Sequence, residues 1–194
     1  MKKALVLGAG GFIGSHMVKR LKTEDYYVVG ADIKLPEFST TEADNFYVCD
    51  LTDKLEFDKI FSTEQHFDEI YQYAADMGGA GFIFTGDNDA QIMHSSVSIN
   101  LNLLSLLEAN YESLEKLKVF YSSSACIYPQ QIQETTNNLG LKEDFAYPAN
   151  PDSEYGWEKL FSERLFLTYY KNFGLKVRIA RFHNIYGPLG TWDG

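Results

Sequence analysis

The sequence has only two cysteines among its 194 residues. Cys49 and Cys126 are far apart in the chain, so they indicate neither a set of zinc ligands nor a disulfide framework, and no metal site is predicted. Two isolated thiols favour a reducing compartment, and we expect a cytoplasmic protein. No apolar run reaches the roughly 20 residues that a membrane-spanning helix needs, so no membrane association is expected.

Basic residues are also few. The chain has 17 Lys and Arg against 27 Asp and Glu, and its formal net charge is −10. Such a charge repels the backbone of nucleic acids and anionic lipid headgroups, so neither is expected as the main partner. A local basic pocket for a phosphorylated small molecule is still compatible with it. With 45% hydrophobic residues, the chain is expected to form one globular domain over residues 1–194.

Short β-type runs alternate with helical patterns along the whole chain. Apolar residues recur at helical spacing in residues 12–21, for example, whereas residues 26–31 form a continuous apolar run. This alternation predicts an α/β fold with a doubly wound parallel sheet, the Rossmann fold, because parallel strands need crossovers that cover both faces. The expected strands are 4–7, 26–31, 45–48, 69–75, 118–122 and 176–182, and the expected helices are 12–21, 54–61, 97–109 and 153–173.

Two segments, residues 76–91 and 128–152, are expected to be unusually long loops. Both follow strands, so they should lie at the carboxyl edge of the sheet, where such folds bind ligands. The chain ends at Gly194 in GPLGTWDG, a composition typical of a loop. We therefore expect a truncated chain.

Glycines recur at Gly8, Gly11 and Gly14, directly after a strand pattern and at the start of a helical one. A turn without side chains lets a pyrophosphate approach the amides at the N-terminus of the helix. Asp32 ends the next strand and can accept hydrogen bonds from ribose hydroxyls, whereas it would repel a 2′-phosphate. The pattern predicts a site for NAD rather than NADP. The alternative for the glycine loop is a plain tight turn without a ligand, and the alternative for Asp32 is a solvated carboxylate at the end of a strand.

Further cofactor contacts are expected at the start of the first helix and at the ends of neighbouring strands. Asp50 can reach the amino group of adenine, although Asp50 or Asp53 could instead cap the helix that follows. Cys49 fits a small core residue. The remaining expected contacts are Phe12, Ile13, Leu51, Ala74, Ala75, Tyr155 and Lys159.

Tyr155 and Lys159 lie four residues apart at the start of a long helical segment, so they share one helix face. A free phenol has a pKa of about 10, and a neighbouring ammonium lowers that pKa by favouring the phenolate. Such a tyrosine can take a proton from a substrate hydroxyl while hydride leaves the same carbon for NAD⁺. Ser124 would hydrogen-bond the same hydroxyl. The spacing alone is common in ordinary surface pairs, so the hypothesis depends on the glycine loop as well.

Three further stretches carry a family resemblance: residues 75–83 (ADMGGAGFI), 123–129 (SSACIYP) and 181–188 (RFHNIYGP). With the glycine loop and the Tyr155/Lys159 pair, they resemble the extended short-chain dehydrogenases of the NAD-dependent epimerase/dehydratase family. Within this family they are similar to the GDP-mannose 3,5-epimerases. The resemblance runs over all 194 residues, and its specific parts are ACIYP and RFHNIYGP.

The resemblance implies an isomerase that acts on a nucleotide sugar, GDP-mannose. Tyr155 and Lys159 would assist the reversible oxidation of C4 of the hexose, in which NAD⁺ accepts the hydride, and the ketone would acidify the protons on C3 and C5. Cys126 matches the family's acid/base, and a thiol, with a pKa near 8.5, is closer to neutrality than a serine hydroxyl. Gly78 and Asn184 match substrate-binding residues, beside Ser124. The alternative for Cys126 is a buried small apolar residue, and the alternative for Asn184 is a residue that caps a loop.

The chain departs from the family in two places. The lysine that opposes the cysteine lies beyond Gly194 in the family, and so does most of the sugar-nucleotide domain. By itself, this chain is therefore expected to bind NAD without efficient epimerisation. Residues 84–89 also lengthen the loop that would contact the substrate.

Members of the superfamily pair through two long helices, which residues 97–109 and 153–173 match, so the resemblance implies a homodimer.

Two alternatives to the epimerase stay open: another 4-epimerase or a dehydratase of the superfamily, and a non-catalytic NAD-binding module. A dehydratase would need a carboxylate near Cys126, where the sequence has Ala125 instead. The histidines at 16, 94 and 183 are predicted to be structural.

Overall fold

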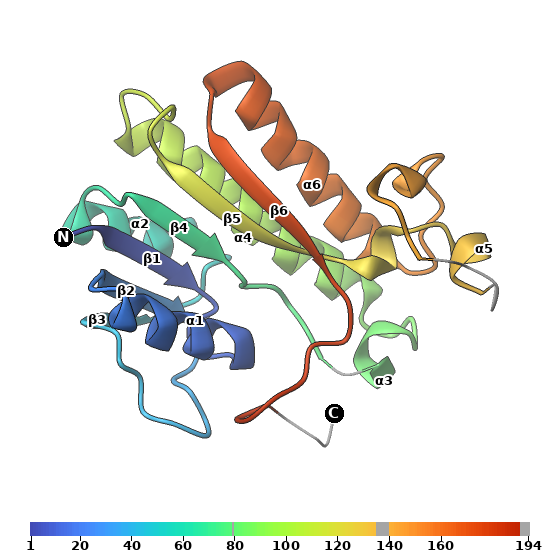
Figure 1. Ribbon diagram of the computed structural model, residues 1–194, viewed down its shortest axis with the longest axis horizontal. Helices are drawn as coiled ribbons and strands as arrows, with labels where there is room; N and C mark the ends of the chain where they lie inside the picture. Colours follow the sequence, from blue (N-terminus) through green and yellow to red (C-terminus); the bar gives the residue numbers. More distant parts are fainter. Residues whose placement is uncertain (79, 135–139, 191–194) are drawn as a thin grey trace.

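The computed structural model describes residues 1–78, 80–134 and 140–190. Its centre is a sheet of six parallel strands in the order β3-β2-β1-β4-β5-β6 (Figure 1). This order is that of the Rossmann fold, and it confirms the predicted α/β class. The strands are β1 (Lys3–Leu7), β2 (Tyr27–Asp32), β3 (Asn45–Val48), β4 (Glu69–Gln72), β5 (Lys118–Ser124) and β6 (Lys176–Phe182).

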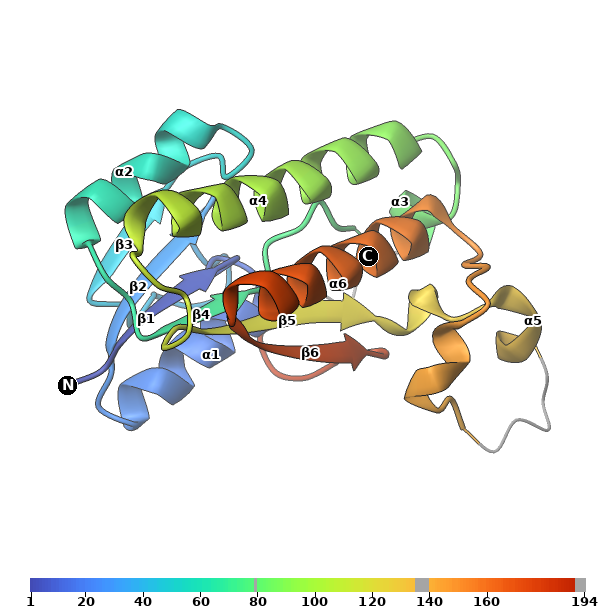
Figure 2. The ribbon, with the colours of Figure 1, turned by 90° about the horizontal axis from the view of Figure 1, so that it is seen from above.

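Helices lie on both faces of the sheet. The chain forms α1 (Phe12–Thr23), α2 (Lys54–Glu64), α3 (Ala80–Ile83), α4 (Asp89–Asn110), α5 (Gln130–Gln133) and α6 (Glu154–Phe173), with short 3₁₀ turns η1 (Ala125–Ile127) and η2 (Glu143–Ala146). Figure 2 shows α2, α4 and α6 on one face and α1 on the other. The buried side chains accordingly form a large cluster under α2, α4 and α6 and a smaller one under α1.

The strand order reverses at β1, which lies between β2 and β4. The loops after β1 and β4 therefore leave the sheet toward opposite faces and open a crevice between them, the usual ligand position in such sheets. Among the described residues, no helix is both long and apolar enough to cross a membrane.

Strand β4 ends at Gln72, three residues earlier than predicted. The Gln72 side chain takes over the hydrogen bonds of the next turn: its Oε1 accepts from the Ala74 amide at 3.1 Å, and its Nε2 donates to the Ala74 carbonyl at 3.0 Å. The Tyr73 amide still donates to the Leu7 carbonyl at 3.0 Å, but regular strand structure ends before it. The apolar run 73–75 thus forms an irregular segment at the carboxyl edge of the sheet, called the Ala74 turn below.

Helix α4 begins at Asp89, eight residues before the predicted start at Val97. The first turns bury Ile92 and Ser96, and the buried polar residues Ser96 and Asn100 interrupt the apolar stripe that indicates a helix. The predicted loop 76–91 is therefore shorter and contains α3. The predicted loop 128–152 contains α5 and η2, while Gly79 and residues 135–139 and 191–194 lie outside the described residues.

Both ends of helix α6 follow from its sequence. The Ser153 hydroxyl accepts a hydrogen bond from the Gly156 amide at 3.2 Å, and Gly174 ends the helix with a φ of 69°. An N-cap of this kind contributes about 1 kcal/mol to stability. The cap fixes the first turn of α6, which carries Tyr155.

Candidate active site

A cleft of about 1200 Å³ lies at the carboxyl edge of the sheet. It runs from the glycine loop and the end of β2 to the end of β5 and the start of α6. Every cofactor, catalytic and substrate residue expected from the sequence lines it. They are Gly8, Gly11, Phe12, Ile13, Gly14, Asp32, Asp50, Leu51, Ala74, Ala75, Gly78, Ser124, Cys126, Tyr155, Lys159 and Asn184.

The glycine loop packs closely against the turn after β4. Gly8 has a φ of +82°, and a Cβ there would lie 2.8 Å from the Ala74 nitrogen, so only glycine fits without strain. Helix α1 starts after Gly11 with no side-chain cap and no acidic residue in its first turn. The first turn of α1 therefore brings no carboxylate of its own to its N-terminal amides, an arrangement that suits a pyrophosphate.

Asp32 lines the cleft and also holds the loop. Its Oδ2 accepts a hydrogen bond from the Gly10 amide at 2.9 Å, and its Oδ1 accepts from the Lys34 amide at 3.2 Å. Each carboxylate oxygen has a second lone pair available to a ligand hydroxyl. The residue is thus tied to the fold while its carboxylate stays at the cleft, where a ribose would bind.

The two aspartates after β3 have different roles. Asp53 caps α2, since its Oδ1 accepts from the amides of Leu55 at 2.8 Å and Glu56 at 3.3 Å. Asp50 accepts from the Thr52 amide at 2.8 Å in a local turn and lines the cleft. The capping alternative therefore applies to Asp53, whereas Asp50 lies at the cleft.

Tyr155 and Lys159 are both almost fully buried in the floor of the cleft. The Lys159 ammonium donates to the Ser122 carbonyl at 3.3 Å and lies 5.2 Å from the ring centre of Tyr121 and 5.6 Å from that of Tyr155. It thus faces the tyrosine rings rather than a phenol oxygen. Ser122 was not expected from the sequence, because a backbone carbonyl leaves no trace in residue type.

The pKa of Tyr155 moves in the opposite direction to the one predicted. Burial raises the pKa of the Tyr155 phenol, and the hydrogen bond with Ser124 offsets only part of this rise. Burial likewise lowers the pKa of Lys159, against the charge of Glu158. The ammonium acts on the ring face, so it does not compensate for the desolvation of the phenolate.

Cys126 sits in η1, half-buried beside Tyr155. A Cβ at Gly156 would lie only 2.3 Å from the Cys126 carbonyl, so glycine lets the first turn of α6 approach η1. Burial raises the pKa of the Cys126 thiol, the hydrogen bond with Ser124 lowers it, and the charge of Asp152 raises it. The sequence indicated no carboxylate near Cys126. The structure brings Asp152, at the end of the predicted loop 128–152, near enough to affect the thiol.

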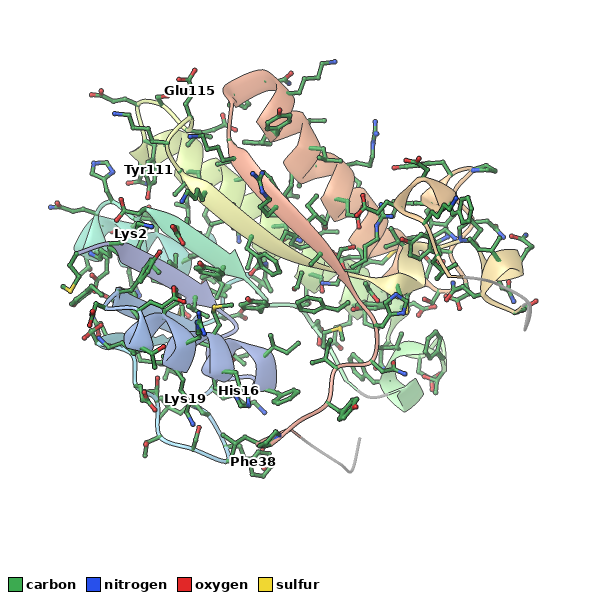
Figure 3. The ribbon with its side chains drawn as sticks, viewed as in Figure 1. Lys2, His16, Lys19, Phe38, Tyr111 and Glu115 are labelled. Atoms are coloured by element: carbon green, nitrogen blue, oxygen red, sulfur yellow. The ribbon has the colours of Figure 1, made fainter. Side chains whose placement is uncertain are left out.

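The part of the cleft lined by Gly78 and Asn184 is formed by segments that other contacts hold in place. The Asp76 amide donates to the Ser96 hydroxyl at 3.0 Å, which ties the turn before Gly78 to α4. His16, labelled on α1 in Figure 3, contacts the Pro188 carbonyl at 2.7 Å. This contact links α1 to the segment that carries Asn184 and gives the predicted structural histidine a partner.

Glu158 is a second residue near Lys159 that the sequence analysis did not single out. It lies between Tyr155 and Lys159 in the chain and is completely buried. The sequence did offer one signal: Glu158 is adjacent to Lys159 on a helix whose neighbouring residues face the core. Its burial could not be read from spacing alone, because Trp157 on the same turn is 40% exposed.

A parallel sheet, a glycine loop at the head of α1, and Ser124, Tyr155 and Lys159 in one cleft define a Rossmann-fold protein of the short-chain dehydrogenase type. The model of the NAD dependent epimerase/dehydratase family matches residues 4–193. The chain belongs to this family.

Comparison with known proteins places the chain near sugar-nucleotide epimerases. It is 43% identical to GDP-mannose 3,5-epimerase of Arabidopsis thaliana over 99% of this chain and 49% of the relative. It is 31% identical to putative UDP-arabinose 4-epimerase 4 of the same plant, over 94% and 41%. The structure of UDP-glucose 4-epimerase from Thermus thermophilus in complex with NAD has the same fold, with a TM-score of 0.82, 24% identity, and coverage of 99% and 58%. The chain spans about half the length of the curated relatives it matches.

Proposed function

We propose that the full-length protein is an NAD-dependent epimerase of a nucleotide sugar and that it inverts C3 and C5 of GDP-mannose. The observation that carries this proposal is the position of Cys126. Cys126 lines the same cleft as Ser124 and Tyr155, in a chain 43% identical to a GDP-mannose 3,5-epimerase. A 4-epimerase needs no acid/base at that place, because only hydride moves to and from C4.

The residues of the cleft fit NAD. The open amides of α1 suit the pyrophosphate, and Asp32 suits the ribose hydroxyls and disfavours a 2′-phosphate. Gly8, Gly11, Phe12, Ile13 and Gly14 would surround the pyrophosphate, while Asp50 and Leu51 would contact the adenosine and Ala74 and Ala75 the centre of the molecule. Bound NAD⁺ would supply the acceptor for a hydride, which is returned later in the reaction.

The chain's own residues perform the proton transfers. Tyr155 takes the proton of the C4 hydroxyl as hydride leaves C4, and Ser124 positions that hydroxyl by a hydrogen bond. The ketone at C4 makes the protons on C3 and C5 acidic. Cys126 would remove or return a proton at these carbons, and Gly78 and Asn184 would hold the sugar. The proton that returns on the opposite face comes from a second group, which we place outside residues 1–194.

The reaction can be tested with the full-length gene product and GDP-mannose in deuterated water. Removal and return of carbon-bound protons must transfer deuterium to C3 and C5, and mass spectrometry of the sugar would detect it. The 194-residue chain alone should bind NAD and give no efficient exchange. Sugar that gains no deuterium, with NAD bound to folded full-length protein, would contradict the 3,5-epimerase.

The second candidate is a 4-epimerase, because the chain is also 31% identical to a putative UDP-arabinose 4-epimerase. In that reaction the hydride leaves C4 and returns to its other face without exchange with solvent. Inversion at C4 of a UDP-sugar, supplied in place of GDP-mannose in the same deuterated water, would therefore identify this candidate if no deuterium is taken up.

A homodimer is part of the proposal. The adjacent helices α4 and α6 expose the apolar residues Leu101 (46%), Trp157 (40%) and Phe161 (48%), and two copies could bury them in a four-helix bundle. We expect Phe161→Glu to convert the dimer into a monomer, because it places a charge in this contact. Light scattering after gel filtration would measure the mass. Phe38→Glu, on the α1 side of the sheet (Figure 3), is the control and should remain dimeric; a monomeric parent would overturn the proposal.

A further inference from the structure

Glu158 is a buried carboxylate with one free oxygen. Its side chain is 0% exposed, and its Oε1 accepts a hydrogen bond from the Ser162 hydroxyl at 2.8 Å. Its Oε2 has no hydrogen-bond partner among the described residues and lies 3.9 Å from the Lys159 nitrogen. Burying a carboxylate is unfavourable in free energy unless a positive charge pairs with it, so the partner of Glu158 indicates its role.

A chain of buried hydrogen bonds points at this carboxylate. The Gln72 amide donates to Asn100 Oδ1 at 2.7 Å, Asn100 Nδ2 donates to the Ser162 hydroxyl at 2.9 Å, and Ser162 donates to Glu158. Every donor in the chain is directed toward Glu158, so Oε1 must act as an acceptor. Aligned donors polarise one another and stabilise a negative charge at their end.

The other end of this chain reaches the cofactor cleft. Gln72 is the residue whose side chain forms both hydrogen bonds to the turn at Ala74, and Ala74 lines the cleft beside Gly8. The chain therefore joins the end of β4, the middle of α4 and the first turns of α6. It connects the segment that would contact NAD with the Glu158 carboxylate beside Lys159.

Lys159 needs a counter-charge in this environment. It faces Tyr155 from its own helix and Tyr121 from β5, both through their rings, and the Ser122 carbonyl. These groups are neutral at neutral pH, and among the described residues Glu158 is the carboxylate that pairs with Lys159. Burial lowers the pKa of Lys159, and the charge of Glu158 opposes this change.

We infer that Glu158 is a positioning residue for the reaction: it keeps Lys159 as an ammonium ion in the floor of the cleft. Ser162, Asn100 and Gln72 orient its carboxylate and tie the ion pair to the Ala74 turn. The inference rests on the proposed function only in giving Lys159 a catalytic role. The ion pair itself exists without nucleotide or sugar, so it can be tested without either.

The test is a pH titration of the 194-residue chain labelled with ¹³C at lysine Cε and followed by NMR. The Lys159 signal is assigned by its loss in Lys159→Arg. In Glu158→Gln, the amide still accepts from Ser162 but carries no charge. We expect its Lys159 midpoint to fall by at least about one pH unit, a tenfold loss of proton affinity. Glu154→Gln removes an exposed charge from the same helix and should leave the midpoint in place.

A Glu158→Gln midpoint equal to that of the parent would overturn the inference. If this variant does not fold, Ser162→Ala decides in its place. It removes the hydroxyl that orients the Glu158 carboxylate, so the Lys159 midpoint should fall in the same direction, and an unchanged midpoint in this variant would equally overturn the inference. Calorimetry with NAD reports separately on the proposed function, so a failure of one is distinguishable from a failure of the other.

Discussion

Cys126→Ala should abolish deuterium uptake at C3 and C5 of GDP-mannose while oxidation at C4 continues. Acid/base groups of this kind contribute roughly 10²–10⁴-fold in rate, so the exchange rate of the full-length variant should fall by at least about 100-fold. Because Tyr155 and Ser124 remain, reduced nicotinamide should still form and accumulate. Mass spectrometry of the sugar and the absorbance of reduced nicotinamide would measure the two steps separately.

The pH dependence gives this prediction a second readout. Burial and the charge of Asp152 raise the pKa of the Cys126 thiol, so the thiol is protonated at neutral pH and the thiolate forms only as the pH rises. Exchange in the parent should therefore increase with pH into the alkaline range, and Cys126→Ala should lack this increase. Cys49→Ala is the matched control at saturating NAD, since burial raises the pKa of that thiol to about 11. Exchange by Cys126→Ala at the parent's rate would make Cys126 a packing residue.

The fold could be predicted from the sequence to a large extent because its signals are local. The apolar runs of β1 and β2 and the helical spacing of α1 each follow from neighbouring residues, and parallel pairing follows from their alternation. The errors come from contacts between distant segments. Strand β4 stops at Gln72 because that side chain binds the Ala74 turn, and the early start of α4 is hidden because Ser96 and Asn100 face the core.

The candidate site shows the same division. Residues whose chemistry follows from their type, such as the glycine loop, Asp32 and the Tyr155/Lys159 pair, are candidates on the sequence alone, and the structure places them in one cleft. Roles that depend on distant neighbours could not. Glu158 gains its role from Asn100 and Gln72 through Ser162, and Asp152 approaches Cys126 only because the loop before α6 folds back.

Tyr155→Phe should block the first chemical step, in contrast to Cys126→Ala. The variant keeps the ring that packs in the cleft floor beside Lys159 but loses the hydroxyl that takes the C4 proton. We expect both the formation of reduced nicotinamide and the deuterium uptake to fall by about 10²–10⁴-fold, with NAD affinity within about twofold of the parent, since the change is one oxygen at the floor of the cleft. Tyr170→Phe, an exposed change on the same helix (59%), is the control.

The direction of the Tyr155 pKa makes this prediction specific. Burial raises the pKa of the phenol, so Tyr155 is protonated at neutral pH and its phenolate fraction grows as the pH rises. The rate of C4 oxidation in single-turnover experiments should therefore increase with pH in the parent, and the residual rate of Tyr155→Phe should not. The positive charge of bound NAD⁺ favours the phenolate, so it should lower the pKa of Tyr155 relative to that in the protein without NAD⁺. The pH profile of the parent's oxidation rate should therefore shift to lower pH. A Tyr155→Phe variant that oxidises C4 within tenfold of the parent would assign the proton transfer to another group.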